Sequence, residues 1–356
     1  MYCRHNGGLI SIGLGANTNL GTVVISSNQL TEIDVTQNTG LVTLDLGGNQ
    51  LTEIDVTQNI NLLDLRLWDN NLSEIDVSQN LNLTELWLNQ NQLTDIDVSV
   101  NTNLGFLNVP QNQLTSLDVS YNTNLTILGC SNNQLTEIDV SNNLYLRSLN
   151  CGYNQLVDIN LGQVSFGYFG GESNLSCGNN QLTEIDISQA TSLQNLWVSE
   201  NFLTDLDVSN NIQLSGLYCF DNNLNSLDLR NGYNQNLAVL QTYDNPNLSC
   251  IYVDDEIYSS SQWNDNIFYL YNIFDSQHYF SENCPEFLVV CGDVNNDGSL
   301  NSQDAALILQ FIVGLIDLEG QQIENGDVNN DGSLNSQDAA LILQHIVGLI
   351  DELTCD

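Results

Sequence analysis

The chain has 356 residues, and its 44 acidic side chains against four arginines and no lysine give a formal net charge of −40. Such a surface argues against nucleic acid and anionic membranes as partners, and it favours multivalent cations or a cationic partner. No run of 18 apolar residues occurs, so the sequence predicts no membrane span.

The chain opens inside an incomplete repeat. The segment MYCRHNGG lacks the apolar core of a signal peptide. Gly7 stands one repeat before Asn28, so the first repeat is cut short. We therefore expect the true N-terminus, with an export signal and a capping turn, to precede Met1.

Residues 83–103, LTELWLNQNQLTDIDVSVNTN, show the unit that most of the chain repeats. The pattern LxxLxLxxNxL is that of a leucine-rich repeat. Its asparagine recurs every 21 residues up to Asn154, then after 26, 21, 21 and 23 residues up to Asn245. The apolar positions of this unit are Leu83, Leu86, Leu88, Leu93, Ile96 and Val98, with Asn91 between the third and fourth.

The repeat decides the architecture. Six buried apolar side chains per turn contribute about 9–18 kcal/mol, whereas ordering a turn of this length costs about 30 kcal/mol. One turn cannot fold alone, but stacked turns complete each other's core. We predict a solenoid over residues 1–245, mostly strand and coil, with a parallel sheet of about eleven turns on its concave face and structural asparagines at an inner corner.

Large aromatic side chains occupy strand positions that alternate with the buried leucines and so point out of the sheet. Exposed aromatics at such positions suit sugar stacking or protein hot spots. The alternative is β-propensity and cross-strand packing alone. The predicted ligand-binding residues are Trp68, Trp87 and Phe106 towards one end, and Trp197, Tyr218, Phe220 and Tyr243 towards the other.

The segment LTEIDVS recurs after each repeat asparagine and places carboxylates outward in every turn. Like charges at sheet spacing repel, so we expect turn hydrogen bonds and solvent to compensate, with Ca²⁺ along the ribbon as the alternative. The aspartates are Asp34, Asp55, Asp76, Asp97, Asp118, Asp139, Asp186, Asp207 and Asp228, and the glutamates are Glu32, Glu53, Glu74, Glu137 and Glu184.

Four cysteines, Cys130, Cys151, Cys177 and Cys219, replace the second buried leucine of a turn. We expect them to be free thiols of the core. The three histidines lie elsewhere in the sequence, which argues against a zinc site.

Two segments interrupt or end the repeats. Five extra residues precede Asn180, and Val164–Gly171 should form a protruding loop with Phe166, Tyr168 and Phe169 at its tip. Residues 246–290 are rich in aromatics and should cap the solenoid. Their NPNLSC opening and closing SENC resemble the terminal cap of extracellular repeat proteins from bacteria of the Bacteroidetes type.

Residues 292–317 and 326–351 are duplicates that differ at Phe311 against His345. Each opens GDVNNDGSLNSQD, in which oxygen ligands fall at positions 1, 3, 5, 7, 9 and 12 of an EF-hand-type loop. Hard oxygen ligands at that spacing select Ca²⁺, so we predict two calcium ions. The ligands are Asp293, Asn295, Asp297, Ser299, Asn301 and Asp304, and in the copy Asp327, Asn329, Asp331, Ser333, Asn335 and Asp338.

The loops end on aspartate, and a single helix, AALILQFIVGLI or its copy, follows each loop. These features and the tandem spacing resemble a type I dockerin over residues 291–356. The resemblance implies calcium-dependent docking to a cohesin-like domain, often within polysaccharide-degrading assemblies. The chain departs from the family by carrying Gln310, Phe311 and Gly314 where many dockerins have Lys or Arg. The implied partner-docking residues are Ser302, Gln303, Ser336 and Gln337.

Two disulfides are predicted, Cys250–Cys284 at the cap and Cys291–Cys355 across the dockerin-like module. These four cysteines fall into pairs that each flank one unit, while Cys3 has no such partner. Disulfides also imply an oxidising compartment, which fits a secreted or cell-surface protein.

The sequence favours a secreted, non-catalytic binding protein whose repeats recognise a protein or glycan ligand. An enzyme is the second hypothesis, because Asp64 and Glu85 have the spacing of a retaining carboxylate pair, but a flat sheet offers no pocket for catalysis. A structural subunit of a surface layer or extracellular fibre is the third.

Overall fold

The structure is a computed structural model. It describes residues 1–3, 8–15, 17–167, 173–263, 274–275, 277–284, 291–295, 300–318, 321–350 and 353. The chain forms two compact units, Met1–Glu282 and Asn283–Asp356. The first unit contains the repeats together with the cap elements, and the second contains the duplicated loops.

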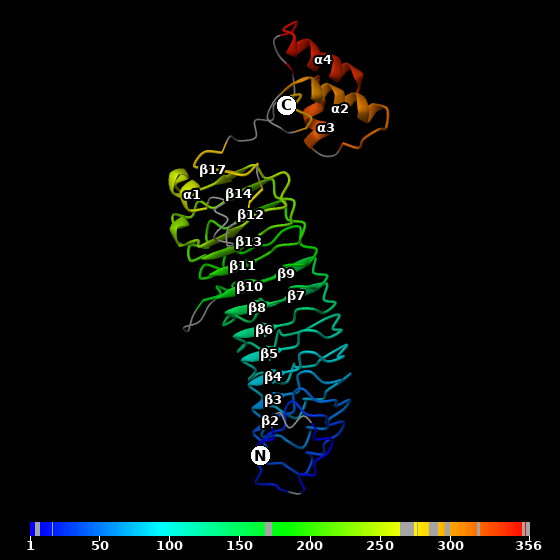
Figure 1. Cartoon of the computed structure of the whole chain (residues 1–356), viewed down its shortest axis with the longest axis vertical. Helices are drawn as coiled ribbons and strands as arrows, with labels where there is room; N and C mark the ends of the chain where they lie inside the picture. The colour runs from blue at the N-terminus through cyan, green and yellow to red at the C-terminus, as the bar shows by residue number, and fades with distance from the viewer. Residues whose placement is uncertain are drawn as a thin grey trace. The chain divides into compact units, whose positions relative to one another are not determined.

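The first unit is a solenoid built on an eleven-stranded parallel sheet, whose strands stack one above another (Figure 1). Each strand pairs with the next in the register of the repeat, so that Leu65, Leu86 and Leu107 lie side by side. The strands are β1 (Thr22–Val24), β2 (Thr43–Asp45), β3 (Asp64–Arg66), β4 (Glu85–Trp87), β5 (Phe106–Asn108), β6 (Ile127–Gly129), β8 (Ser148–Asn150), β10 (Asn174–Ser176), β11 (Asn195–Trp197), β13 (Gly216–Tyr218) and β15 (Val239–Gln241).

The core of the solenoid consists of the predicted apolar positions. Leu83, Leu86, Leu88 and Leu93 are fully buried, as are their equivalents in neighbouring turns. Each strand side chain that faces the core meets the same position of the turns above and below, so burial repeats at the strand spacing. The predicted parallel solenoid of about eleven turns is therefore confirmed.

The repeat asparagines tie adjacent turns together. Asn91 donates from Nδ2 to the carbonyls of Leu67 (2.9 Å) and Leu88 (3.0 Å), and its Oδ1 accepts from the Leu72 N–H (3.0 Å). Because it satisfies three buried backbone groups, an apolar residue cannot replace it without loss. A second column of fully buried asparagines, not expected from the sequence, also donates hydrogen bonds to backbone carbonyls of preceding turns. Its members are Asn38, Asn59, Asn80, Asn101, Asn122, Asn143 and Asn211.

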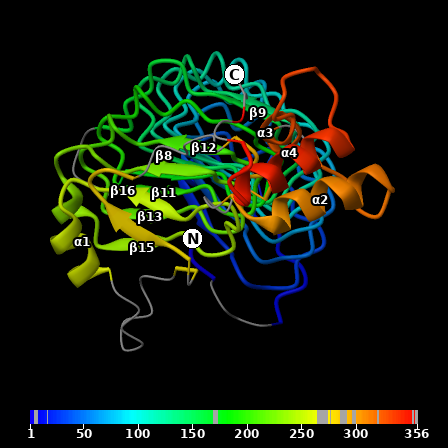
Figure 2. The same cartoon turned by 90° about the horizontal axis from the view of Figure 1, so that it is seen from above.

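The aspartate-bearing segments form further strands in the later turns. Viewed down the stack, β11, β13 and β15 lie on one side of the coil, and β9 and β12 lie nearer another (Figure 2). The two additional parallel sheets comprise β7 (Glu137–Asp139) with β9 (Asp158–Asn160), and β12 (Asp205–Asp207), β14 (Ser226–Asp228), β16 (Cys250–Tyr252) and β17 (Tyr279–Ser281) in that order.

The cap extends the solenoid beyond the last repeat. Besides β16 and β17 it contains helix α1 (Glu256–Gln262), and a short 3₁₀ turn, η1 (Asn234–Asn236), precedes it. Trp263 is buried and donates from Nε1 to the Leu237 carbonyl at 3.1 Å. Phe280 meets Trp263 and Phe274 edge to face. Aromatic rings thus cover the end of the repeat core, as a solenoid terminus requires.

The prediction for the insertion before Asn180 was wrong at Phe166. That side chain is fully buried in the repeat core, and so is Val164. The reason is local: Phe166 adopts a positive φ of 52°, which turns the chain so that the ring enters the core instead of solvent. Tyr168 and Phe169 lie outside the described residues.

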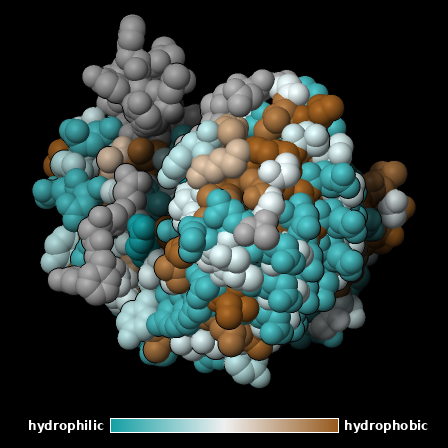
Figure 3. Space-filling view, turned by 90° about the horizontal axis from the view of Figure 1, so that it is seen from below, coloured by the Kyte–Doolittle hydropathy of each residue, from teal (hydrophilic) through white to brown (hydrophobic). Residues whose placement is uncertain are grey.

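The N-terminal end of the stack has a mixed surface, with apolar patches among hydrophilic side chains (Figure 3). The apolar residues of the first turn, including Leu9, Ile12 and Leu14, pack against the core but are not fully buried. Tyr2 and Ile10 are exposed. The first turn is therefore less well covered than the interior turns.

The second unit contains helices α2 (Ser302–Ile312), α3 (Gln321–Gly326) and α4 (Ser336–Ile346). α2 and α4 pack against each other around Ile308 and Ile342. The sequence predicts one helix per copy, and the short helix α3 between the copies is additional. None of the helices in the described part of the chain is long and apolar enough to cross a membrane.

Candidate functional site

Aromatic side chains form stacked pairs on the solvent side of the eleven-stranded sheet, which we call the sheet face. Trp197 on β11 stacks on Tyr218 on β13, with ring centroids 5.0 Å apart and planes inclined by 10°. Phe220 and Tyr243 stack at 4.5 Å and 7°. All four rings are half-buried. The rings stand on the sheet and cover one another's faces, because residues in register lie one strand apart.

A third pair, Trp87 and Phe106, lies towards the other end of the sheet face. It is a diagonal stack between β4 and β5, with centroids 4.1 Å apart and planes inclined by 26°. Trp68 lies two residues beyond the end of β3, in the position that Phe220 and Tyr243 occupy after their strands. Its ring covers Gly47, where an added Cβ would clash with the indole.

The seven predicted ligand residues thus form two aromatic groups. Four of them lie in strands, at Trp87, Phe106, Trp197 and Tyr218, and the other three follow strands by two residues. Cross-strand stacking, the alternative interpretation, also occurs, so the rings are both structural partners and exposed surface. Their role in binding a ligand stays a prediction.

Arg66 organises the charges beside Trp87. Its Nε lies 2.8 Å from Asp64 Oδ1 and its Nη2 lies 3.2 Å from Glu85 Oε2, while its Cζ sits 5.3 Å from the Trp87 ring centre. The hydrogen bond with Asp64 and the nearby carboxylates raise the pKa of Arg66. The candidate catalytic pair Asp64 and Glu85 is therefore a salt-bridge cluster, an arrangement that holds both carboxylates to a fixed cation.

Three carboxylates that the sequence interpretation missed border the other aromatic group. Glu200, Asp221 and Asp244 are exposed. Burial raises the pKa of Tyr243, and the charges of these three carboxylates raise it further. Each directly precedes the repeat asparagine and has a positive φ of 54° to 56°. This shared place in the repeat is the signal that could have identified them.

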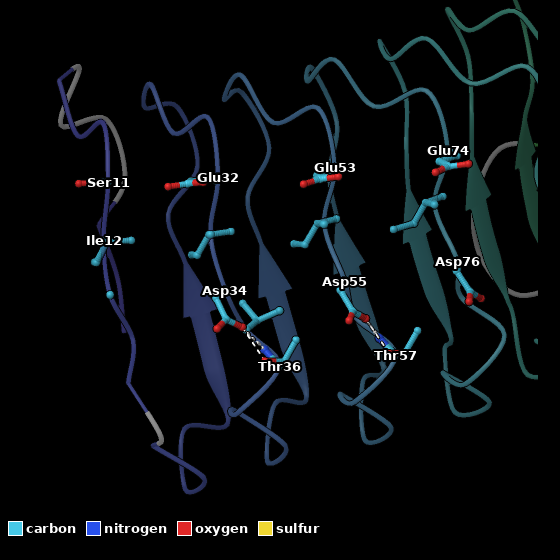
Figure 4. A pocket seen from close by; sticks show the side chains of 15 residues that line it. Ser11, Ile12, Glu32, Asp34, Thr36, Glu53, Asp55, Thr57, Glu74 and Asp76 are labelled. Carbon is cyan, nitrogen blue, oxygen red and sulfur yellow. Dashed lines mark hydrogen bonds between the residues drawn. The ribbon is translucent and has the colours of Figure 1, made fainter.

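The aspartate column lies on a different side of the coil. Over the first turns it forms an open groove of about 1050 Å³, in which Glu32, Glu53 and Glu74 make one row and Asp34, Asp55 and Asp76 a parallel one (Figure 4). Each aspartate of the column accepts a hydrogen bond from the backbone N–H two residues on, as Asp97 does from Ser99 at 2.9 Å. Turn hydrogen bonds are thus the compensation that the sequence predicts.

The second predicted calcium loop, residues 327–338, is folded around its own carboxylates. Asp327 accepts from the backbone N–H groups of Asp331 (3.1 Å) and Gly332 (2.7 Å). Asp338 is buried, and its Oδ1 has no hydrogen-bond partner. Burial and the charges of Asp327 and Asp331 raise the pKa of Asp338. An orphaned buried carboxylate oxygen near two other carboxylates fits a site that a hard cation such as Ca²⁺ completes.

In the first loop the equivalent aspartate, Asp304, is likewise buried, and its Oδ2 accepts from the Asn301 N–H at 2.8 Å. Asp297 and Ser299 lie outside the described residues. Within the described ranges no three His, Cys, Asp or Glu side chains converge as a metal site. An EF-hand-type ligand set also uses Asn side chains and a backbone carbonyl, so the ligand residues and the number of ions stay predictions.

The predicted docking residues are exposed at equivalent places. Ser302 and Gln303 begin α2, and Ser336 and Gln337 begin α4. Sequence reasoning missed the apolar side chains that both copies expose further along each helix, although the repeated IVGLI run signals them. They are Leu309, Ile312, Val313 and Leu315 in the first copy and Leu343, Ile346, Val347 and Leu349 in the second.

The four core cysteines are free and fully buried, as predicted. Cys250, Cys284 and Cys291 each form a disulfide. Cys250 and Cys284 are buried. Cys355 lies outside the described residues, and the pairings Cys250–Cys284 and Cys291–Cys355 stay predictions.

Comparison with known proteins supports the assignment of both the C-terminal domain and the repeat unit. The family model of the dockerin type I domain matches residues 291–347. No curated protein matches the chain at the level of sequence. The functional domain of InlJ from Listeria monocytogenes, described as including a cysteine ladder, has 38% sequence identity and a TM-score of 0.63. The alignment covers 69% of this chain and 53%, about half, of that chain.

Other solved structures share the fold. A leucine-rich-repeat protein of Leptospira interrogans has 25% identity and a TM-score of 0.61, over 72% of this chain and 67% of that one. A leucine-rich-repeat protein of Bacteroides thetaiotaomicron, at 15% identity and a TM-score of 0.51 over 71% of this chain and 37% of its own, shows the fold alone. The likeness to caps of the Bacteroidetes type stays a prediction. Residues 291–347 are thus a type I dockerin domain, and the residues before them form a solenoid of the leucine-rich-repeat fold.

Proposed function

We propose that this chain is a secreted, non-catalytic binding protein. Its sheet face recognises a protein or glycan ligand, and its dockerin domain attaches it, in a calcium-dependent way, to a cohesin-type scaffold or a cell surface, within polysaccharide-degrading machinery. Leucine-rich-repeat and dockerin folds are typically binding modules, so protein interaction and scaffold docking follow from the two folds themselves.

The observation that carries the ligand-binding proposal is the set of stacked, half-buried rings on the sheet face. Rings held rigid by their neighbours offer large contact area with little conformational entropy to lose, as binding hot spots do. They stand on an extended, eleven-stranded parallel sheet. This arrangement fits recognition of a surface or an extended polymer better than chemistry on a small substrate.

The docking proposal is supported by the paired exposed surfaces of α2 and α4. Each copy presents a Ser-Gln pair at the helix start and four exposed apolar residues towards its end. Exposed apolar side chains repeated in this way mark an interaction surface. Calcium bound in the loops would hold the N-terminal ends of both helices and so fix the surface that a cohesin meets.

The ligand-binding proposal is tested with the full chain in calcium on arrays of glycans and extracellular proteins. We compare the wild type with Trp87→Ala and Trp197→Ala, and use Tyr145→Ala, an exposed aromatic of the turns, as the matched control. Loss of a hot-spot tryptophan should weaken binding by about 2 kcal/mol or more. Binding that both tryptophan variants retain in full would place the ligand site elsewhere.

A further inference from the structure

The two aromatic groups of the sheet face differ in one respect: among the described residues, an arginine lies over a ring of the first group alone. Arg66 lies over the Trp87 ring and is held by the carboxylates of Asp64 and Glu85. Arg230 repeats this arrangement on the other side of the coil, with its Cζ 4.3 Å from the Tyr252 ring centre and its Nη2 2.6 Å from Asp228 Oδ2. Arg66 and Arg230 are thus both seated between an aromatic face and a carboxylate.

The second aromatic group presents the same surroundings without an arginine. Trp197, Tyr218, Phe220 and Tyr243 are stacked in pairs, and Glu200, Asp221 and Asp244 lie near Tyr243. Among the described residues, these three carboxylates form no ion pair. The chain has four arginines and no lysine against 44 acidic residues, so cations to balance them must come from outside.

One ring face of this group has no stacked aromatic neighbour among the described residues. Tyr218 covers one side of Trp197, and the residue paired with Trp197 on the opposite strand, β10, is Ser176. A serine is too short to cover an indole. The open side of the ring therefore offers a platform on which a guanidinium can stack.

From these observations we propose that the rings of β11, β13 and β15, with Glu200, Asp221 and Asp244, bind an extended, arginine-bearing segment of a partner protein. The proposal rests on the ligand-binding function assigned to the sheet face and names its partner. Arginine fits better than lysine, because its planar fork stacks on a ring while donating two hydrogen bonds to a carboxylate. The three carboxylates lie on successive turns about 4.8 Å apart, a spacing that an extended basic segment can follow.

The surface suits a sugar less well. The carboxylates of Glu200, Asp221 and Asp244 beside the stacked rings attract a cation, whereas a neutral pyranose gains nothing from their charges. A second copy of this chain is also a poor occupant, because two chains of charge −40 repel each other.

The test measures binding of a fluorescent peptide of alternating arginine and serine to the full chain in calcium. The comparison peptide carries citrulline, which keeps the shape of arginine but removes its charge. The variant Glu200→Gln/Asp221→Asn/Asp244→Asn removes three charges at the site. Its control, Asp34→Asn/Asp55→Asn/Asp76→Asn, removes three charges from the aspartate column and so lowers the overall charge equally. A further variant, Trp197→Ala, removes the stacking platform.

We expect the site variant and Trp197→Ala each to weaken binding of the arginine peptide by about tenfold or more. The control triple variant should weaken this binding by about twofold or less. The citrulline peptide should bind about tenfold more weakly than the arginine peptide. Equal weakening by the two triples would show general charge attraction and overturn the inference, as would an arginine peptide that does not bind. If the peptide fails while an array ligand depends on Trp197, the proposed function stands without this partner. If neither the peptide nor any array ligand depends on Trp87 or Trp197, both proposals fail.

Discussion

The chemical properties of single residues in this chain depend on the side chains around them in neighbouring turns. Cys130, Cys151 and Cys177 follow three adjacent strands in register, so the thiols lie one turn apart in the core. Burial raises the pKa of Cys130 and of Cys177 to about 12. A thiol that stays protonated is a small apolar group and a poor nucleophile.

Native protein should therefore resist alkylation at the core cysteines. With iodoacetamide at neutral pH, we expect Cys3, which is partly exposed, to react. Cys130, Cys151, Cys177 and Cys219 should react only after unfolding in guanidinium, because the thiolate is the reactive form. Peptide mapping before and after denaturation measures this. Modification of any of the four in folded protein would contradict it.

A buried histidine makes the cap sensitive to acid. The His278 side chain is 1% exposed, its Nδ1 lies 3.0 Å from Thr242 Oγ1, and its Nε2 lies 3.6 Å from Asp275 Oδ2. Burial lowers the pKa of His278 below 6.5, against a smaller opposing effect of Asp275. Because the folded pKa is depressed, the neutral form stabilises the fold, and this stability is lost as pH falls below 6.5.

We expect the thermal unfolding temperature of the repeat unit to fall between about pH 7 and about pH 5. His278→Gln should flatten this dependence, because glutamine does not titrate. His345→Gln, a change in the other unit, is the matched control and should leave the slope of the repeat-unit transition unchanged. A wild-type transition that does not move over this pH range would argue against the prediction.

At the scale of the element, each turn of the solenoid depends on an asparagine for its connection to the next. Asn91 joins its own turn to the preceding one through two buried hydrogen bonds, to Leu67 and Leu72, and makes a third to Leu88 within its own turn. Asn103 donates one exposed bond to the preceding turn, at the Leu81 carbonyl (3.0 Å). Both are asparagines of the same repeat, and they differ in burial and in the number of backbone groups that they satisfy. Hydrogen bonds that satisfy buried backbone groups are the ones that are costly to remove.

Replacement of Asn91 by alanine should lower the free energy of unfolding by about 2–4 kcal/mol, because it leaves buried donors and acceptors without partners. Asn103→Ala should change it by about 0.5 kcal/mol or less. Urea unfolding of the repeat unit, followed by circular dichroism, gives both values. Equal effects would mean that the two asparagines do not differ as their burial implies.

At the scale of the whole molecule, two compact units with different cores imply two unfolding transitions. The repeat unit has a continuous apolar core, whereas the second unit has a small one and gathers carboxylates in its loops. Mutual repulsion of these carboxylates opposes folding until a cation offsets it, so calcium binding and folding should be linked.

We expect calorimetry to show a transition of the dockerin domain that is present in calcium and absent in chelator. The repeat-unit transition should be the same in both, which makes it an internal control. Asp338→Ala should weaken the calcium dependence, because it removes the buried ligand of the second loop. Unchanged unfolding of residues 291–356 in chelator would rule out the coupling.

The duplicated helices should allow docking in two orientations related by a half turn. Mutation of Ser302 and Gln303, or of Ser336 and Gln337, should leave affinity for a cohesin-like partner largely intact, and mutation of both pairs should abolish it. Phe311 and His345 break the symmetry of the two copies. Both are half-buried, so each alters the shape of the docking surface beside it and favours one orientation. A variant of one pair that loses all binding would show that a single face docks.

Much of this architecture could be predicted because every repeat places apolar residues at the same spacing. Leucines at fixed spacing, such as Leu86 and Leu88, can be buried only if the turns stack, so the parallel sheet follows from the sequence. The same holds for the core cysteines and for the aspartates, whose turn hydrogen bonds involve residues two positions away. The dockerin loops are recognisable because their ligand spacing is local.

Contacts between side chains of different turns could not be predicted, because they depend on which side chains become neighbours across strands. Phe166 is an exposed loop residue by sequence, yet a positive φ directs it into the core. Asp64 and Glu85 have the spacing of a catalytic pair, and only the folded chain shows Arg66 between them. Glu200, Asp221 and Asp244 are separated by about twenty residues each in the sequence, but stacking at strand spacing brings them beside Tyr243. The repeat, its apolar core and the duplicated loops follow from local spacing along the chain, whereas the surfaces shared by charges and rings depend on which turns become neighbours in the folded molecule.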